Sequence, residues 1–455
     1  MTIMINILFG SGTRDCSGQT RRNFLRAGSL AFGGLLLPRA QAAEAKFIKD
    51  KAVVMVFLAG GASHIETFNP NMGAPEPYCS ITGETKTSVP GITFGGTFEK
   101  LAHQMKRAAI VRSFKHTVGN HEQAISHVLT GGTDPNGQAQ AGSSIGSMYA
   151  RCRGANHETT GLPTYAVLTA PHKDPQYARE LSRVMVGSRA GSLGAGFEPF
   201  VPTGKGPALD NMTLRIPADR IDDRRSLLQQ IDSFKIESER GNLDRQAAEL
   251  IAGGAGRAFD LSKEPKAIRE KYSTSSFKTG KKTFDSCILG DQFLMARRLI
   301  EAGCGYVTVQ SAGWDMHADG NNPPVKVGME MLGRPLDQAL SVFLDDLADR
   351  GLLEKTLVVV TGDFGRTPKI NKNGGRDHWA NLGTLAFFGG GIKGGQVIGQ
   401  SAKNNDVPAS EPITPANLFS TLFHHLFDVG VLRVTRNMPT SIINTVSATK
   451  PIELW

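Results

Sequence analysis

Short apolar runs recur along the chain. The longest spans 51–61 and reads KAVVMVFLAGG, and shorter ones lie within 107–114, 163–170 and 384–392. Uninterrupted runs of this length are typical of strands that are buried on both faces, as in a parallel sheet covered by helices. The pattern therefore predicts a buried, mostly parallel sheet.

Amphipathic segments with helical spacing separate these runs. The segments 286–303 and 333–351 begin the same order twice: helix, glycine, short link, strand and polar cluster. Gly303 stands where a helix C-cap is expected, and Thr414 is the expected N-cap of a late helix over 414–430. This alternation predicts an α/β protein, a three-layer α/β/α sandwich with a mostly parallel sheet.

Polar clusters stand at the ends of the predicted strands, where open α/β sheets bind their ligands. Asp315 and His317 follow one strand, and Asp363, Arg366 and His378 follow another. Two further clusters lie in the first part of the chain. Their candidate residues are Ser63, Glu66 and His121.

Aspartate and histidine side chains that meet at one sheet edge suit a divalent metal ion such as zinc, manganese, calcium or magnesium. Such an ion would polarise a phosphate or sulfate ester. Arg366 suits a tetrahedral oxyanion, because a guanidinium can donate two parallel hydrogen bonds. We expect His121 to act as acid, base or ligand, and Ser63 is a candidate nucleophile. The expected metal ligands are Asp315, His317, Asp363, His378 and Glu66.

Each of these residues also fits a structural role when it is taken singly. Asp363 can cap a helix, Arg366 can be its ion-pair partner, and a single histidine is as often a core residue as a ligand. Their common position at one edge of the predicted sheet is what favours a site.

The N-terminal segment has the order of a twin-arginine export signal. Arg21 and Arg22 precede an apolar run over 29–38, and small residues follow it. The run is too short for a membrane span, which favours an export signal over the alternative of a membrane anchor. We predict a signal peptide over 1–42, a domain over 43–455, and a periplasmic or extracellular protein that meets the twin-arginine export machinery.

The charge and cysteine patterns argue against a nucleic-acid-binding protein and against a zinc-knuckle protein. The formal net charge is +9, and it falls to +5 without 1–42, which hold five arginines and one aspartate. No run of lysine and arginine alternates with aromatic residues, so we expect no nucleic-acid partner. None of the five cysteines forms a CxxC pair, which argues against a zinc knuckle.

The segment 173–282 shows the least regular pattern of apolar and polar positions in the chain, and we expect an inserted lobe there.

Several motifs resemble those of the DUF1501 family, exported bacterial proteins described as sulfatase-like and related to alkaline phosphatases and sulfatases. The motifs are FLAGGASHIETFNP, RSFKHTVGNHEQAISHVLTGG, GWDMH and DFGRTPKINKNGGRDHW. The resemblance implies an alkaline-phosphatase-like domain whose divalent ions hydrolyse phosphate or sulfate esters on a small molecule or a polysaccharide. By position, Asp315, His317 and His378 resemble one metal site of that superfamily, and Asp363 resembles the strand-end aspartate of a second.

The chain also departs from that superfamily. The first predicted strand ends in Gly60 and Gly61, where the superfamily usually has an aspartate, and the Cys-x-Pro-Ser-Arg motif of true sulfatases is missing. Asn120 and His121 stand where that cysteine would fall. Two alternatives therefore stay open: a non-catalytic relative that binds a glycan or an anion, and an enzyme with a single metal ion.

Overall fold

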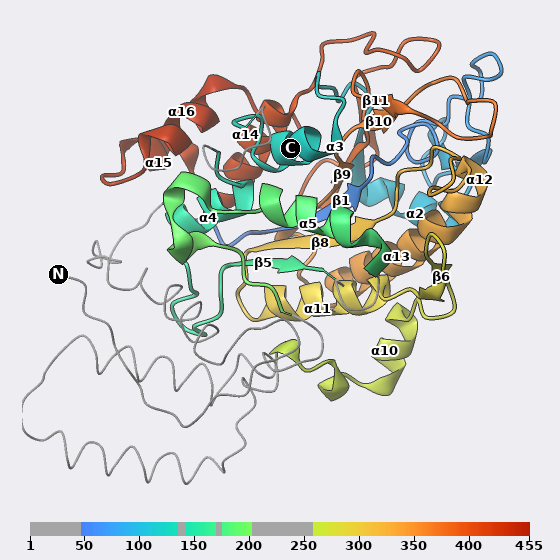
Figure 1. The fold of residues 1–455 in the computed structure, drawn as a ribbon. Helices are drawn as coiled ribbons and strands as arrows, with labels where there is room; N and C mark the ends of the chain where they lie inside the picture. Colours follow the sequence, from blue (N-terminus) through green and yellow to red (C-terminus); the bar gives the residue numbers. More distant parts are fainter. Residues whose placement is uncertain (1–46, 135–141, 170–174, 203–257) are drawn as a thin grey trace, which may run out of the picture.

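A seven-stranded sheet forms the centre of the protein in the computed structural model, which describes residues 47–134, 142–169, 175–202 and 258–455 (Figure 1). The strand order is β13-β4-β12-β9-β1-β8-β5. The strands are β1 (Ala52–Ala59), β4 (Ala108–Val111), β5 (Tyr165–Leu168), β8 (Tyr306–Ala312), β9 (Thr356–Gly362), β12 (Leu385–Gly389) and β13 (Gln396–Ile398).

The sheet is parallel except for one strand, which confirms the prediction of a mostly parallel sheet. β12 runs antiparallel to both of its neighbours, β4 and β9. β1 lies between β8 and β9, and Leu58 faces Ser311 on one side and Gly362 on the other. These three strands therefore finish at the same level, and the residues that follow them are brought to one edge.

The side chains of β1 alternate between two cores. Val54, Val56 and Leu58 pack with one set of helices, whereas Val53 and Phe57 pack with the other. Burial of each such side chain contributes about 1.5–3 kcal/mol. Because both faces of the sheet are covered, the three-layer α/β/α prediction is confirmed.

Helices on the first face are α2 (Glu99–His103), α10 (Lys266–Tyr272), α11 (Leu289–Glu301), α12 (Val325–Gly328) and α13 (Arg334–Asp349) (Figure 1). Helices on the second face are α3 (His121–Leu129), α4 (Ile145–Arg153), α5 (Ala178–Gly187), α14 (Pro415–Leu426), α15 (Val429–Val434) and α16 (Thr440–Ala448). Outside the main sheet, three short antiparallel pairs are β2 (Glu84–Lys86) with β3 (Thr93–Gly95), β6 (Lys278–Thr279) with β7 (Asp285–Ser286), and β10 (Gly365–Arg366) with β11 (His378–Trp379).

The C-terminus of α11 and the N-terminus of α14 are capped by the residues that the sequence predicted. Gly303, with φ at +98°, donates its N–H to the carbonyl of Ile300, and Cys304 donates to Leu299. This Schellman pattern ends α11. At the start of α14, Thr414 and Asn417 cap each other's backbone N–H groups.

Two of the predicted segments lie wholly or partly outside the described residues. They are the export signal over 1–42 and the stretch 203–257 of the expected lobe over 173–282. Within the part of the chain that the structure describes, no helix has both the length and the apolarity to span a membrane.

Candidate metal centre

Asp315 is placed by the loop that follows β8. The N–H of Trp314 donates to the carbonyl of Ala59 at 3.1 Å, which ties this loop to the end of β1. Gly60 has φ at +108°, and a Cβ on it would lie 2.7 Å from the backbone nitrogen of Asp315. A glycine at this position therefore makes room for the Asp315 backbone.

Asp363 follows β9 directly and is fully buried. Its Oδ1 accepts the N–H of Gly60 at 3.0 Å, and its Oδ2 lies 2.5 Å from Nδ1 of His121. His121 is the first residue of α3, where Asn120 caps the helix by accepting the N–H of Glu122 at 2.9 Å. Asp363 thus fixes the orientation of the His121 ring.

His378 comes to the same place from β11. The antiparallel pair of β10 and β11 sets Arg366 opposite His378. Nδ1 of His378 donates to the carbonyl of Gly119 at 3.0 Å, which orients the ring. The rings of His121 and His378 are 4.3 Å apart between centroids.

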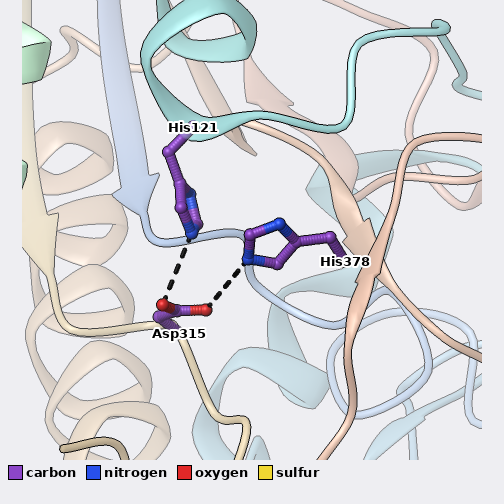
Figure 2. A group of neighbouring side chains, drawn as sticks. All are labelled: His121, Asp315 and His378. Atoms are coloured by element: carbon purple, nitrogen blue, oxygen red, sulfur yellow. Dashed lines mark ion pairs between the residues drawn. The ribbon is translucent and has the colours of Figure 1, made fainter.

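His121, Asp315 and His378 converge from three different elements, and both imidazole rings point toward the Asp315 carboxylate (Figure 2). Nε2 of His121 is 3.4 Å from Oδ2 of Asp315, and Nε2 of His378 is 3.4 Å from Oδ1. The three candidate ligand atoms all lie within 4.8 Å of one another. Among the described residues, this is the group of histidine, cysteine and acidic side chains whose geometry suits a metal ion.

The hydrogen bonding of the two rings fits a metal ion. Both Nε2 atoms are buried and make no hydrogen bond, whereas both Nδ1 atoms have protein acceptors. Histidines that bind metals usually donate the other ring nitrogen to a carboxylate or a backbone carbonyl, which leaves the first nitrogen's lone pair for the ion. The residues present therefore fit a divalent cation.

Electrostatics favour a cation at this point. Burial opposes ionisation of Asp315, but His121, His317, His378 and Arg366 hold its pKa well below the ordinary value. Burial also acts to lower the pKa of His121, but the carboxylates of Asp315 and Asp363 raise it to about 9. The same two carboxylates that raise this pKa would attract a metal ion to Nε2 of His121 in place of a proton.

His317 lies beside this triad, with its two nitrogens facing two carboxylates. Nε2 is 2.9 Å from Oδ1 of Asp315, and Nδ1 is 3.0 Å from Oδ1 of Asp377. The hydrogen bond to Asp315 is the main reason that the pKa of His317 is raised. The structure thus brings His317 to the site, with Asp377 orienting it.

Arg366 reaches the site, where most of its donors already have protein acceptors. The side chain is 1% exposed, and four of the five N–H groups of its guanidinium donate to protein oxygen atoms. The acceptors are the carbonyls of Gly60, Gly61 and Arg376 and the carboxylate of Asp315, and the fifth N–H group lies beside Nε2 of His317. In this arrangement Arg366 holds Asp315 and the Gly60–Gly61 turn in place, and its expected role toward an oxyanion stays a prediction.

Glu66 does not reach the triad. It is fully buried and forms an ion pair with Arg376 at 2.9 Å. Its Oε2 accepts the hydroxyl groups of Ser80 at 2.7 Å and Thr82 at 2.8 Å. Both carboxylate oxygens already have protein partners, so the contacts of Glu66 are structural, and its expected role as a metal ligand stays a prediction.

Ser63 is buried, and its Oγ accepts the N–H of Glu66 at 3.4 Å. Among the described residues, no hydrogen bond joins Ser63 to His121, Asp315 or His378. Its role as a nucleophile stays a prediction.

Sequence reasoning gave Arg376 no role, although it lies two positions before His378. Arg376 is fully buried and donates to Glu66 and to three carbonyls, those of Cys79, Thr367 and Pro368. Its place in the GRDHW motif was the available signal. The partner Glu66 is 310 positions away, and the sequence pattern does not reveal that pairing.

Solved structures with a related arrangement are distant from this chain. The lipoteichoic acid synthase LtaP from Listeria monocytogenes has 9% identity and a TM-score of 0.40, and the match covers 88% of this chain and 77% of that one. The sulfatase PsFucS1 from Pseudoalteromonas sp. has 12% identity and a TM-score of 0.33, with 88% and 71% covered. The alkaline phosphatase from the Antarctic bacterium TAB5 has 14% identity and a TM-score of 0.33, with 79% and 96% covered.

No curated protein matches the chain. A family model described as "Protein of unknown function (DUF1501)" matches residues 50–430, which include every residue of the candidate metal centre. This range is more than half of the sequence, so the resemblance in its motifs is confirmed. The chain belongs to the DUF1501 family.

Proposed function

We propose that the protein is a metal-dependent hydrolase of phosphate or sulfate esters, with one divalent ion bound by His121, Asp315 and His378. The observation that carries this proposal is the pair of buried Nε2 atoms, which lack hydrogen bonds and converge on one carboxylate. Three protein ligands with nitrogen and oxygen donors leave a position open for water or substrate. A bound ion would act there as a Lewis acid toward an ester oxygen and a water molecule.

The neighbouring residues hold these ligands in place. Asp363 and the carbonyl of Gly119 fix the two imidazole rings, so their Nε2 atoms need no rearrangement before binding. Arg366 and His317 hold the Asp315 carboxylate in its ionised form. The choice of phosphate or sulfate esters rests on the sequence resemblance to the alkaline phosphatase and sulfatase superfamily.

The test combines metal content with turnover. The purified protein is loaded with zinc, manganese, calcium or magnesium, dialysed, and analysed by mass spectrometry for bound metal. We expect about one ion per chain, retained in the control variant His103→Gln, whose side chain is exposed. Hydrolysis of p-nitrophenyl phosphate and p-nitrophenyl sulfate is then compared with and without EDTA. A wild-type protein that binds none of the four metals would contradict the proposal.

A second candidate is a non-catalytic relative that binds a glycan or an anion. Two observations favour it: four of the five guanidinium donors of Arg366 are occupied, and Ser63 has no hydrogen bond to the triad among the described residues. Bound metal together with no hydrolysis of any ester would select this candidate.

We also propose that the protein is exported by the twin-arginine route, because of the order of residues in 1–42. The conservative change of Arg21 and Arg22 to lysine would retain the full-length precursor in the cytoplasm of a bacterial host that has this pathway. Fractionation and immunoblotting measure this outcome, and a protein exported equally well without the arginine pair would contradict it.

A further inference from the structure

An open hollow lies beside the candidate metal centre, in the loop between β10 and β11. Its lining residues are Thr367, Lys369, Ile370, Asn371, Lys372 and Asp377. Asp377 bonds to Nδ1 of His317 at 3.0 Å, and Nδ2 of Asn371 donates to the carbonyl of His317 at 2.9 Å. The hollow therefore shares a wall with the site, although it contains none of the three proposed ligands.

The loop that forms this hollow is held in shape at both of its ends. Arg376 donates to the carbonyls of Thr367 and Pro368 and is ion-paired with Glu66 in the interior. Oδ1 of Asn371 accepts the N–H groups of Asn373 at 3.0 Å and Gly375 at 2.9 Å, which closes the far turn. A surface that is fixed before binding loses little conformational entropy when a ligand arrives.

The charge of the hollow is positive. Lys369 and Lys372 are exposed, and within the described residues neither ammonium group has an ion pair or a hydrogen bond. The one acidic residue in the lining, Asp377, already faces His317. Two unpaired ammonium groups on a fixed loop suit tetrahedral oxyanions, to which lysine binds as a point charge.

We propose that this hollow is a subsite for a second anionic group of the substrate, so that the substrate is a polymer with repeated phosphate or sulfate groups. The inference rests on the proposed hydrolase function, and it adds the class of substrate to it. One oxyanion lies at the metal centre, and a neighbouring one along the same polymer lies between Lys369 and Lys372. A small ester with a single anionic group does not use the subsite.

Binding is measured without turnover, by fluorescence anisotropy on EDTA-treated protein. The probes are fluorescein-labelled inorganic polyphosphate and dextran sulfate, with neutral labelled dextran as the negative control. The double variant Lys369→Gln/Lys372→Gln is compared with Lys106→Gln/Lys450→Gln, which removes two exposed lysines elsewhere. We expect roughly three- to tenfold weaker binding of at least one anionic probe to the first variant only, and a smaller difference at high salt.

Unchanged binding in the first variant, an equal loss in the control variant, or no binding of either anionic probe to the wild type would overturn the subsite. The probe with the larger loss identifies the anionic group.

A kinetic measurement ties the subsite to hydrolysis. In the first variant, KM for the anionic polymer would rise, whereas KM for the p-nitrophenyl ester would stay the same. Equal changes for both substrates would overturn the assignment. The two proposals can fail separately. A wild-type protein that binds no metal would contradict the hydrolase function but would not affect the anisotropy result. Unchanged polymer binding in the first variant would contradict the subsite but would not affect the metal result.

Discussion

Two charged clusters of this protein share the segment from Arg376 to His378, and they differ in how their polar atoms are satisfied. In the pair of Glu66 and Arg376, both side chains are fully buried and their polar atoms have protein partners. In the triad of His121, Asp315 and His378, the side chains are partly exposed and two buried nitrogen atoms lack hydrogen bonds.

This difference separates a structural ion pair from a candidate metal site. Buried polar groups in proteins nearly always have hydrogen-bond partners, so an orphaned atom needs a reason. A saturated pair such as Glu66 and Arg376 has no capacity left for a ligand, and it holds the chain in shape. The triad has capacity left on adjacent atoms, which is the property that a metal site requires.

The change with the largest expected effect is Asp315→Asn, which removes the central carboxylate of the triad. We expect loss of the bound ion and a decrease in kcat/KM of about 10³-fold, because a Lewis acid contributes several kcal/mol to catalysis. Metal analysis and ester hydrolysis measure these effects. A variant that keeps its bound metal and its activity would contradict the assignment of the triad as a metal site.

The saturated pair is tested by Glu66→Gln, which leaves Arg376 as a buried, uncompensated charge. We expect the free energy of unfolding to fall by about 3–5 kcal/mol, as measured by urea denaturation. The double variant Glu66→Gln/Arg376→Met is expected to lose less, because both charges are then gone. Lower metal affinity without any loss of stability would instead place Glu66 in the site.

The variant Asp363→Asn tests whether Asp363 binds the metal ion directly or only orients His121. The amide oxygen can still accept the N–H of Gly60, but the charge that orients His121 is lost. We expect metal affinity to fall by about 10- to 100-fold, the range for orienting partners of metal ligands. Isothermal titration measures it, and an affinity loss as complete as that of Asp315→Asn would make Asp363 a direct ligand.

Gly60→Ala has the smallest expected effect. The added Cβ would lie 2.7 Å from the nitrogen of Asp315, at a φ that L residues rarely adopt. We expect a loss of about 1–3 kcal/mol in unfolding free energy, together with weaker metal binding. Gly351→Ala is the matched control, since Gly351 also has positive φ but nothing within 4 Å of its Cβ position. Equal metal affinity in both variants would show that Asp315 tolerates the displacement.

Local features of this protein could be predicted from sequence. The repeated order of helix, glycine and strand predicted β8 and β9, and the motifs at their ends placed Asp315 and Asp363 at one edge of the sheet. Gly303 and Thr414 marked helix ends because capping depends on residues only a few positions apart. These patterns depend on periodicity and on nearest neighbours, which the sequence contains directly.

The roles of individual polar residues were decided by the tertiary structure. Sequence alone gave Glu66, Asp363 and Arg366 the chemistry of a site, but the structure occupies their oxygens or N–H groups with protein partners. Their partners lie far away in the sequence, as Glu66 and Arg376 do at 310 positions apart. The sequence by itself determined which residue types reach the sheet edge. The tertiary structure decided which of their atoms remain available, because hydrogen bonds between distant segments satisfy some atoms and leave the two Nε2 atoms of the triad unsatisfied.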